Sequence, residues 1–124
     1  MSPPISSMMK TQVWSVGMDD TVGKIEEFMK EHDLSWVPVS EPRGRVVGAI
    51  TANDLLQFHV RRGDPAVTAA WQICTYKPIA VALDTSVSEV ARLMLRYKAH
   101  HVVVMDNERI VGVVSSLDFV RQLA

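Results

Sequence analysis

Two short patterns in the sequence pair a hydroxyl with a carboxylate three residues later. Thr51 precedes Asp54, and Ser115 precedes Asp118, each after a short apolar run that contains a glycine. A hydroxyl at a helix start caps a free backbone N–H, worth about 1 kcal/mol, and the helix dipole favours the acid. The free N–H groups also attract phosphate, and a carboxylate can accept a hydrogen bond from each hydroxyl of a ribose. One copy alone leaves capping and ligand binding equally open.

The two patterns belong to an internal repeat that organises the chain. Residues 18–39 align without gaps with residues 83–104, at an offset of 65. Residues 45–56 align with residues 109–120, at an offset of 64. An internal repeat of this kind predicts two similar structural units in one chain.

The elements that must position the two patterns are predicted to be the same in each half. Apolar residues recur at helical spacing from Val22 to Met29 and from Val87 to Met94. The stretch "SVSE" at 86–89 is a capping box that should start the second of these helices. A hairpin and a second helix, beginning near Asn53 or Leu117, follow each first helix. The expected strands are Trp36–Val39, Val46–Ile50, His101–Met105 and Ile110–Val114, with apolar segments Val13–Val16 and Ile79–Leu83 ahead of the two halves.

Composition excludes several classes of protein. The 124 residues are 48% hydrophobic and 22% charged, as in a globular protein, and the net charge of −1 provides no basic excess for nucleic acid. One cysteine, Cys74, permits neither an internal disulfide nor a four-cysteine zinc site. No apolar run approaches the ~20 residues that cross a bilayer. We therefore expect a cytoplasmic protein with no membrane or nucleic-acid partner.

The ordered set of elements, present twice, resembles a tandem pair of CBS domains, the Bateman module. Each half has a "VPV"-like strand and then a strand with Gly, two apolar residues, Ser or Thr, and Asp three residues on. The stretches "MMKTQVWSV" and "ICTYKPIAV" resemble the segment that opens each CBS unit. The resemblance covers the chain from about residue 5 to its end.

This resemblance implies an α+β (α/β) fold of two CBS units, residues 1–62 and 63–124. Each would be a small mixed sheet with helices on one face, the two packed with pseudo-two-fold symmetry. The clefts between such units commonly hold AMP, ADP, ATP, S-adenosylmethionine, NAD or cyclic dinucleotides, and two pairs commonly form a homodimer. The adenosine compound is a regulatory ligand; no obligatory cofactor, metal or enzymatic activity is implied.

The resemblance also assigns site residues. Asp54 and Asp118 would bind ribose, with Thr51 and Ser115 close to the phosphates. The base would enter a slot lined largely by the other repeat. For Asp54 the slot residues would be Thr75, Pro78, Ala80 and the strand start that includes Val102. For Asp118 they would be Thr11, Val13, Ser15, Trp36, Val37 and Pro38. Ordinary core packing explains most of these residues equally well.

Three basic residues are candidates for phosphate contacts: His100, His101 and Lys77. The histidines lie just before a strand, where the first half has Ser35 and Trp36. They could equally be surface or half-buried histidines, and neighbouring strand residues point to opposite faces, which disfavours a shared metal. We expect these basic residues to help the Asp54 cleft bind the phosphorylated ligand, leaving the Asp118 cleft weaker, empty or for a less charged adenosyl group.

Four functions compete at this stage. The leading one is a sensor that binds an adenosine compound and modulates an unknown effector protein. The alternative is a structural or dimerisation module with degenerate pockets. A small enzyme is disfavoured because no nucleophile–base pair or metal-ligand spacing is present, and nucleic-acid binding is disfavoured by the net charge.

Overall fold

The computed structural model describes residues 2–75 and 78–123, and the chain divides into two compact units. The N-terminal unit contains residues 14–77. The C-terminal unit contains residues 78–124 together with residues 1–13. The start of the chain therefore packs with the second repeat and not with the residues that follow it. The boundary predicted between residues 62 and 63 divides the two sequence repeats, and it stays a prediction.

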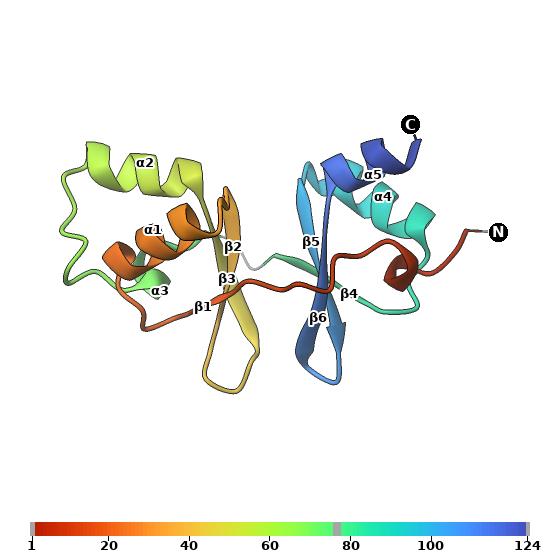
Figure 1. The fold of residues 1–124 in the computed structure, drawn as a ribbon, viewed down its shortest axis with the longest axis horizontal. Coiled ribbons are helices and arrows are strands. Elements are labelled where there is room, and N and C mark those ends of the chain that lie inside the picture. The colour runs from red at the N-terminus through yellow and green to blue at the C-terminus, as the bar shows by residue number, and fades with distance from the viewer. Residues whose placement is uncertain (1, 76–77, 124) are drawn as a thin grey trace. The chain divides into compact units, whose positions relative to one another are not determined.

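The N-terminal unit is a three-stranded mixed sheet with helices on one face (Figure 1). In the order β1-β2-β3, β1 is parallel to β2, and β2 is antiparallel to β3 with a bulge between Val39 and Ser40. This arrangement confirms the predicted hairpin. The elements are β1 (Val16–Gly17), α1 (Val22–Glu31), β2 (Trp36–Ser40), β3 (Val46–Thr51), α2 (Ala52–Val60) and α3 (Ala70–Ile73).

The C-terminal unit repeats the same sheet, in the order β4-β5-β6. Again the first pair of strands is parallel and the second antiparallel, with a bulge between Val104 and Met105. The predicted α+β fold with two small mixed sheets is confirmed. The elements are the 3₁₀ helix η1 (Ile5–Ser7), β4 (Ile79–Ala82), α4 (Val87–Tyr97), β5 (His101–Asp106), β6 (Arg109–Ser115) and α5 (Ser116–Leu123).

Each unit has its own apolar core between the sheet and its helices. The strands supply alternate β-branched side chains to this core, and the residues between them, Pro38 and Val103, are buried as well. The core of the N-terminal unit is built on Val16, Ile25, Met29, Val37, Val39, Ile50 and Ala70. The core of the C-terminal unit is built on Ile5, Val81, Val90, Met94, Val102, Val104 and Val114.

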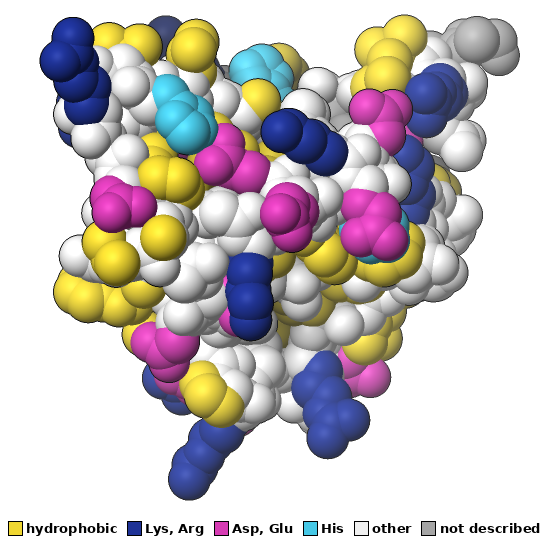
Figure 2. Space-filling model, turned by 60° about the vertical axis from the view of Figure 1, so that its left-hand side comes forward, with side chains coloured by type: hydrophobic (Ala, Val, Ile, Leu, Met, Phe, Trp, Pro, Cys, Tyr) yellow, Lys and Arg dark blue, Asp and Glu magenta, His cyan; other side chains and the backbone are white. Residues whose placement is uncertain are grey.

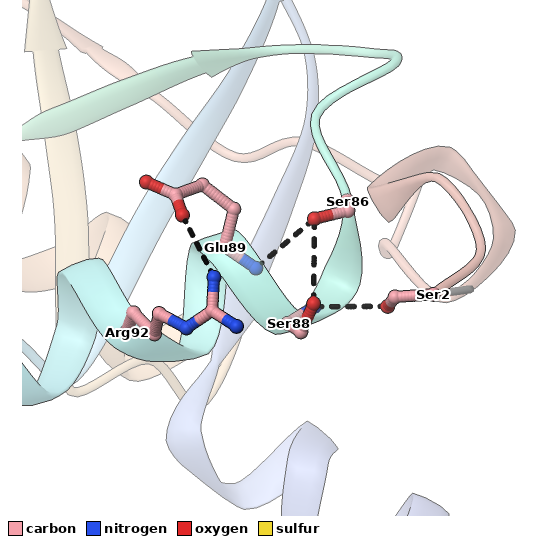
Figure 3. Close-up of polar contacts among 5 residues, drawn as sticks. All are labelled: Ser2, Ser86, Ser88, Glu89 and Arg92. Atoms are coloured by element: carbon pink, nitrogen blue, oxygen red, sulfur yellow. Dashed lines mark hydrogen bonds and ion pairs between the residues drawn. The ribbon is translucent and has the colours of Figure 1, made fainter.

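The N-terminus of α4 is capped by residues from the start of the chain (Figure 3). The Ser86 hydroxyl accepts the Glu89 N–H at 3.1 Å, and the Ser2 hydroxyl accepts the Ser88 N–H at 3.0 Å. The bond to the Ser86 hydroxyl is one half of the predicted capping box. The Glu89 carboxylate, which would make the other half, instead accepts a hydrogen bond from Arg92 at 3.4 Å. Ser2 thus satisfies one of the first N–H groups of a helix whose bonded residue lies 86 positions later in the sequence.

The matching helix of the N-terminal unit, α1, is capped in a similar way. The Val22 N–H donates to the Thr68 carbonyl at 2.8 Å, and the Gly23 N–H donates to the Pro65 carbonyl at 3.0 Å. Thr21 accepts the next N–H in the helix. Each unit is therefore closed by a segment that precedes a repeat: residues 2–10 in the C-terminal unit and residues 65–75 in the N-terminal unit. We call these the closing segments.

Candidate functional site

The Thr51–Asp54 pattern forms a complete capping box at the start of α2. The Asp54 N–H donates to Thr51 Oγ1 at 3.1 Å, and the Thr51 N–H donates to Asp54 Oδ2 at 2.8 Å. Within the described part of the chain, Asp54 Oδ1 takes part in no hydrogen bond or ion pair. One carboxylate oxygen therefore serves the helix, and the other makes no polar contact with residues 2–75 or 78–123.

Ser115 and Asp118 make the same pair of bonds at the start of α5. The Ser115 N–H donates to Asp118 Oδ2 at 2.8 Å, and the Asp118 N–H donates to the Ser115 hydroxyl at 3.3 Å. Asp118 is buried, with 8% of its surface exposed. Its other oxygen, Oδ1, lies 3.5 Å from Lys10 Nζ and 3.8 Å from the Arg121 guanidinium. The two carboxylates thus have the same cap but different surroundings.

The closing segments bring one further side chain to each carboxylate. Thr75 pairs with Ala49 of β3, and its hydroxyl lies 3.4 Å from Asp54 Oδ2. Lys10 pairs in the same way with Val113 of β6, through two backbone hydrogen bonds of 2.9 and 3.0 Å. These contacts place the two residues at equivalent positions of the repeat.

Lys10 is the site residue that the sequence interpretation missed. The family resemblance pointed to Thr11, the next residue, as part of the slot beside Asp118. The repeat offset of 65 between residues 18–39 and 83–104 takes Thr75 to Lys10 instead. Extending that offset toward the N-terminus would have identified Lys10 before the structure was known.

Glycine allows each closing segment to approach its strand. A Cβ on Gly48 would lie 2.8 Å from Cys74 Sγ and 3.0 Å from the Thr75 carbonyl oxygen. A Cβ on Gly112 would meet Met9 Sδ and lie 3.1 Å from the Lys10 carbonyl oxygen. The glycine shared by the two sequence patterns therefore has a steric role: it admits the segment that carries Thr75 or Lys10.

His100 and His101 lie next to Ser115 in the C-terminal unit. His101 is the register partner of Ser115 in the hairpin, and the Ser116 N–H donates to the His100 carbonyl at 2.9 Å. Burial lowers the pKa of His101 below its usual 6.5, and the neighbouring His100 and the Lys10 charge lower this pKa further, whereas the Asp118 carboxylate opposes them. His101 is thus a mainly neutral imidazole at pH 7.

The lowered pKa of His101 predicts a pH dependence of stability. The unfolded chain binds a proton at this residue more readily, so stability is full above about pH 6.5 and falls as the pH drops below it. The fall in melting temperature between about pH 7.5 and pH 5.5 should be smaller in His101→Gln than in the wild type. His100→Gln removes one of the groups that lower the pKa of His101, so its fall in melting temperature should lie between those of the other two proteins. Equal falls in all three proteins would contradict the assignment.

The remaining predicted base-pocket residues differ in exposure. Val37 and Val102 belong to the cores of their own units, so their side chains pack inward. Pro38 is buried, and Val13, Trp36 and Pro78 are half-buried. Thr11, Ser15, Thr75 and Ala80 are exposed. Lys77 lies outside the described residues.

Other kinds of site find little support on this surface. In residues 2–75 and 78–123, no group of three or more His, Cys, Asp or Glu side chains could hold a metal ion. None of the described helices is long and apolar enough to cross a membrane. On the face drawn in Figure 2, acidic and basic side chains are interspersed and form no broad basic patch of the kind that binds nucleic acid.

The two sheets, with a capped carboxylate at the start of one helix in each unit, define a tandem pair of small α+β domains. A family model described as the CBS domain matches residues 5–61 and 70–124. The chain belongs to the CBS domain family, and the resemblance stated from the sequence is confirmed.

Among its relatives, Hypoxic response protein 1 of Mycobacterium tuberculosis is 26% identical over 117 residues, covering 94% of this chain and 82% of that protein. A crystal structure of Hypoxic Response Protein I with two coordinated zinc ions has a TM-score of 0.85 at 24% identity, and covers 98% of this chain and 99% of that one.

Two other similar structures contain adenosyl ligands. The CBS domain pair of protein MJ0100, in complex with 5′-methylthioadenosine and S-adenosyl-L-methionine, has a TM-score of 0.85 at 22% identity, and covers 98% of this chain and 99% of that one. The CBS domain of a bacterial CNNM/CorC family Mg²⁺ transporter in complex with ATP has a TM-score of 0.87 at 21% identity. The match covers 98% of this chain and 87% of that one. At these identities the likeness shows the fold alone.

Proposed function

We propose that the protein is a regulatory module that binds an adenosine-containing ligand of the AMP, ADP, ATP, S-adenosylmethionine or NAD type. The observation that carries this proposal is the carboxylate held at a helix start in both repeats. The adenosyl ligands of MJ0100 and of the CNNM/CorC domain support the choice of ligand class.

The chemistry follows from the residues at each helix start. The carboxylates of Asp54 and Asp118 accept hydrogen bonds from the two ribose hydroxyls. Thr51 and Ser115 shape the helix N-termini, whose dipoles favour a phosphate. The adenine base contacts backbone groups and side-chain edges of the slot residues. For Asp54 these include Thr75 and Val102, and for Asp118 they include Thr11 and Trp36. None of these groups performs a reaction, so the protein acts by binding and not by catalysis.

Regulation requires that the ligand prefer one of two states of the protein. The states proposed here are those that a partner protein distinguishes, either as a conformation or as an association of two copies of the chain. The effector is a protein of unassigned identity, and the homodimer is the assembly that we expect.

A structural or dimerisation module is the second candidate, and one observation favours it. The C-terminal unit has an apolar groove of about 510 Å³ bordered by Met8, Met94 and Phe119. Leu95 beside it is 82% exposed. If this groove pairs with a second copy, Leu95→Glu should shift the sedimentation of the protein from dimer to monomer.

The test of the proposed function is a thermal-shift screen with adenosine compounds. A ligand at a hundred times its dissociation constant stabilises the folded protein by roughly 2.7 kcal/mol. We expect at least one of ATP, ADP, AMP, S-adenosylmethionine, 5′-methylthioadenosine and NAD to raise the melting temperature, and Asp54→Asn together with Asp118→Asn to abolish the rise. If no compound shifts the wild type, the dimerisation module becomes the preferred function.

A further inference from the structure

The surroundings of the two carboxylates differ at four equivalent positions, and at two of these a cation beside Asp118 replaces a neutral residue beside Asp54. Two bonds fix the equivalence: the Ala52 N–H donates to the Ser35 carbonyl, and the Ser116 N–H donates to the His100 carbonyl, both at 2.9 Å. Around Asp118 the four positions hold Lys10, His100, His101 and Arg121. Around Asp54 the same positions hold Thr75, Ser35, Trp36 and Gln57.

From this difference, and resting on the function proposed above, we propose that the two sites select ligands by charge. The site of the C-terminal unit, built on Asp118 and Lys10, takes an adenosine ligand with a 5′-phosphate. The site of the N-terminal unit, built on Asp54 and Thr75, takes an adenosyl group without phosphate. This is the reverse of the expectation from the sequence, which placed the histidines with Asp54.

Lys10 is suited to bind a phosphate because its backbone is fixed and its charge is accessible. Two backbone hydrogen bonds hold residue 10 on β6, while its side chain is 56% exposed. The ammonium group rests 3.5 Å from Asp118 Oδ1. A phosphate entering beside α5 would meet Lys10 and Arg121, and charge-assisted hydrogen bonds of this kind are the stronger class.

Asp54 has different neighbours among residues 14–75 of the N-terminal unit. Within residues 14–75 no cation lies within ion-pair distance of Asp54, and the neighbour from the closing segment is the neutral Thr75. A carboxylate that no cation of residues 14–75 accompanies repels a phosphate and attracts a cation more than one that is paired with Lys10 and Arg121. A neutral thioether such as 5′-methylthioadenosine, or the sulfonium of S-adenosylmethionine, fits that environment.

The experiment exchanges the two equivalent residues. Lys10→Thr, Thr75→Lys and the wild type are titrated calorimetrically with ATP and with 5′-methylthioadenosine. Arg96→Gln, which removes an exposed cation of α4, is the matched control. We expect Lys10→Thr to weaken ATP binding by about tenfold, with a change of less than about twofold for 5′-methylthioadenosine. Thr75→Lys should add a second ATP site per chain, and Arg96→Gln should leave both ligands unchanged.

Two further outcomes separate the inference from the proposed function. If both ligands bind the wild type and Lys10→Thr binds ATP as tightly as Arg96→Gln does, the charge selection is wrong and Lys10 is only a structural partner of Asp118, while the proposed function stands. If neither ligand binds the wild type at any concentration tested, the proposed function fails, and the inference fails with it. The salt dependence gives a second readout: added salt should weaken ATP binding more in the wild type than in Lys10→Thr.

Discussion

Ile5→Ala is expected to lower the free energy of unfolding by about 2–5 kcal/mol, although the residue is the fifth of the chain. Ile5 is 0% exposed and belongs to the core of the C-terminal unit with Val90 and Val102. Its N–H donates to the Thr85 carbonyl at 2.7 Å. Truncating the side chain leaves a cavity beneath the closing segment. Residues this early in a chain ordinarily tolerate substitution, so the expected loss is unusual for its position.

Urea unfolding followed by circular dichroism measures this effect, with Ser6→Ala as the matched control. Ser6 is the next residue of the same 3₁₀ helix and its side chain is exposed. The control should change stability by less than about 0.5 kcal/mol. A loss in Ile5→Ala no larger than that of Ser6→Ala would show that the closing segment does not help to hold the C-terminal unit together.

Asp54→Asn is expected to raise the dissociation constant of the ligand bound at that site by roughly tenfold to a hundredfold. The reason is that a hydrogen bond to a charged group contributes about 1.5–3 kcal/mol. Asparagine keeps one acceptor oxygen for the Thr51 N–H, so the start of α2 should persist. It loses the charge and the second acceptor oxygen that the ribose hydroxyls need.

The control for this variant is Asn53→Ala, an exposed position in the same first turn of α2. Calorimetric titration of both variants with 5′-methylthioadenosine compares them directly. Asn53→Ala should bind as the wild type does. Equal affinities of Asp54→Asn and Asn53→Ala would mean that the Asp54 carboxylate serves the helix alone.

The sheets and main helices could be predicted from the sequence because their signals are local and occur twice. The hairpin of β2 and β3 has a short turn between two apolar runs, and β5 and β6 repeat it. The helix starts at Thr51 and Ser115 have the hydroxyl and acid that cap them. Agreement between two copies of one pattern reduced the ambiguity that a single short apolar run would leave.

The repeat marks the closing segments in the sequence, but their packing against residues far along the chain could not be predicted. Ile5 packs on residues some eighty positions later, and the Val87 N–H donates to the Pro3 carbonyl. Such pairing depends on long-range packing, whereas sequence patterns report on neighbouring residues. In the site, Asp118 was identified by its motif, whereas Lys10 is identified only when the repeat offset is extended to the start of the sequence.

The central claim is that the carboxylate at the helix start holds the ribose of an adenosine ligand, and ATP tests this claim at Asp118. Its most direct measurement needs no substitution in the protein: calorimetric titration of the wild type with ATP and with 2′,3′-dideoxy-ATP. Because only the two hydroxyls differ, we expect the dideoxy compound to bind at least about tenfold more weakly, since each lost bond to a charged group contributes about 1.5–3 kcal/mol. Equal binding of the two compounds would contradict the account.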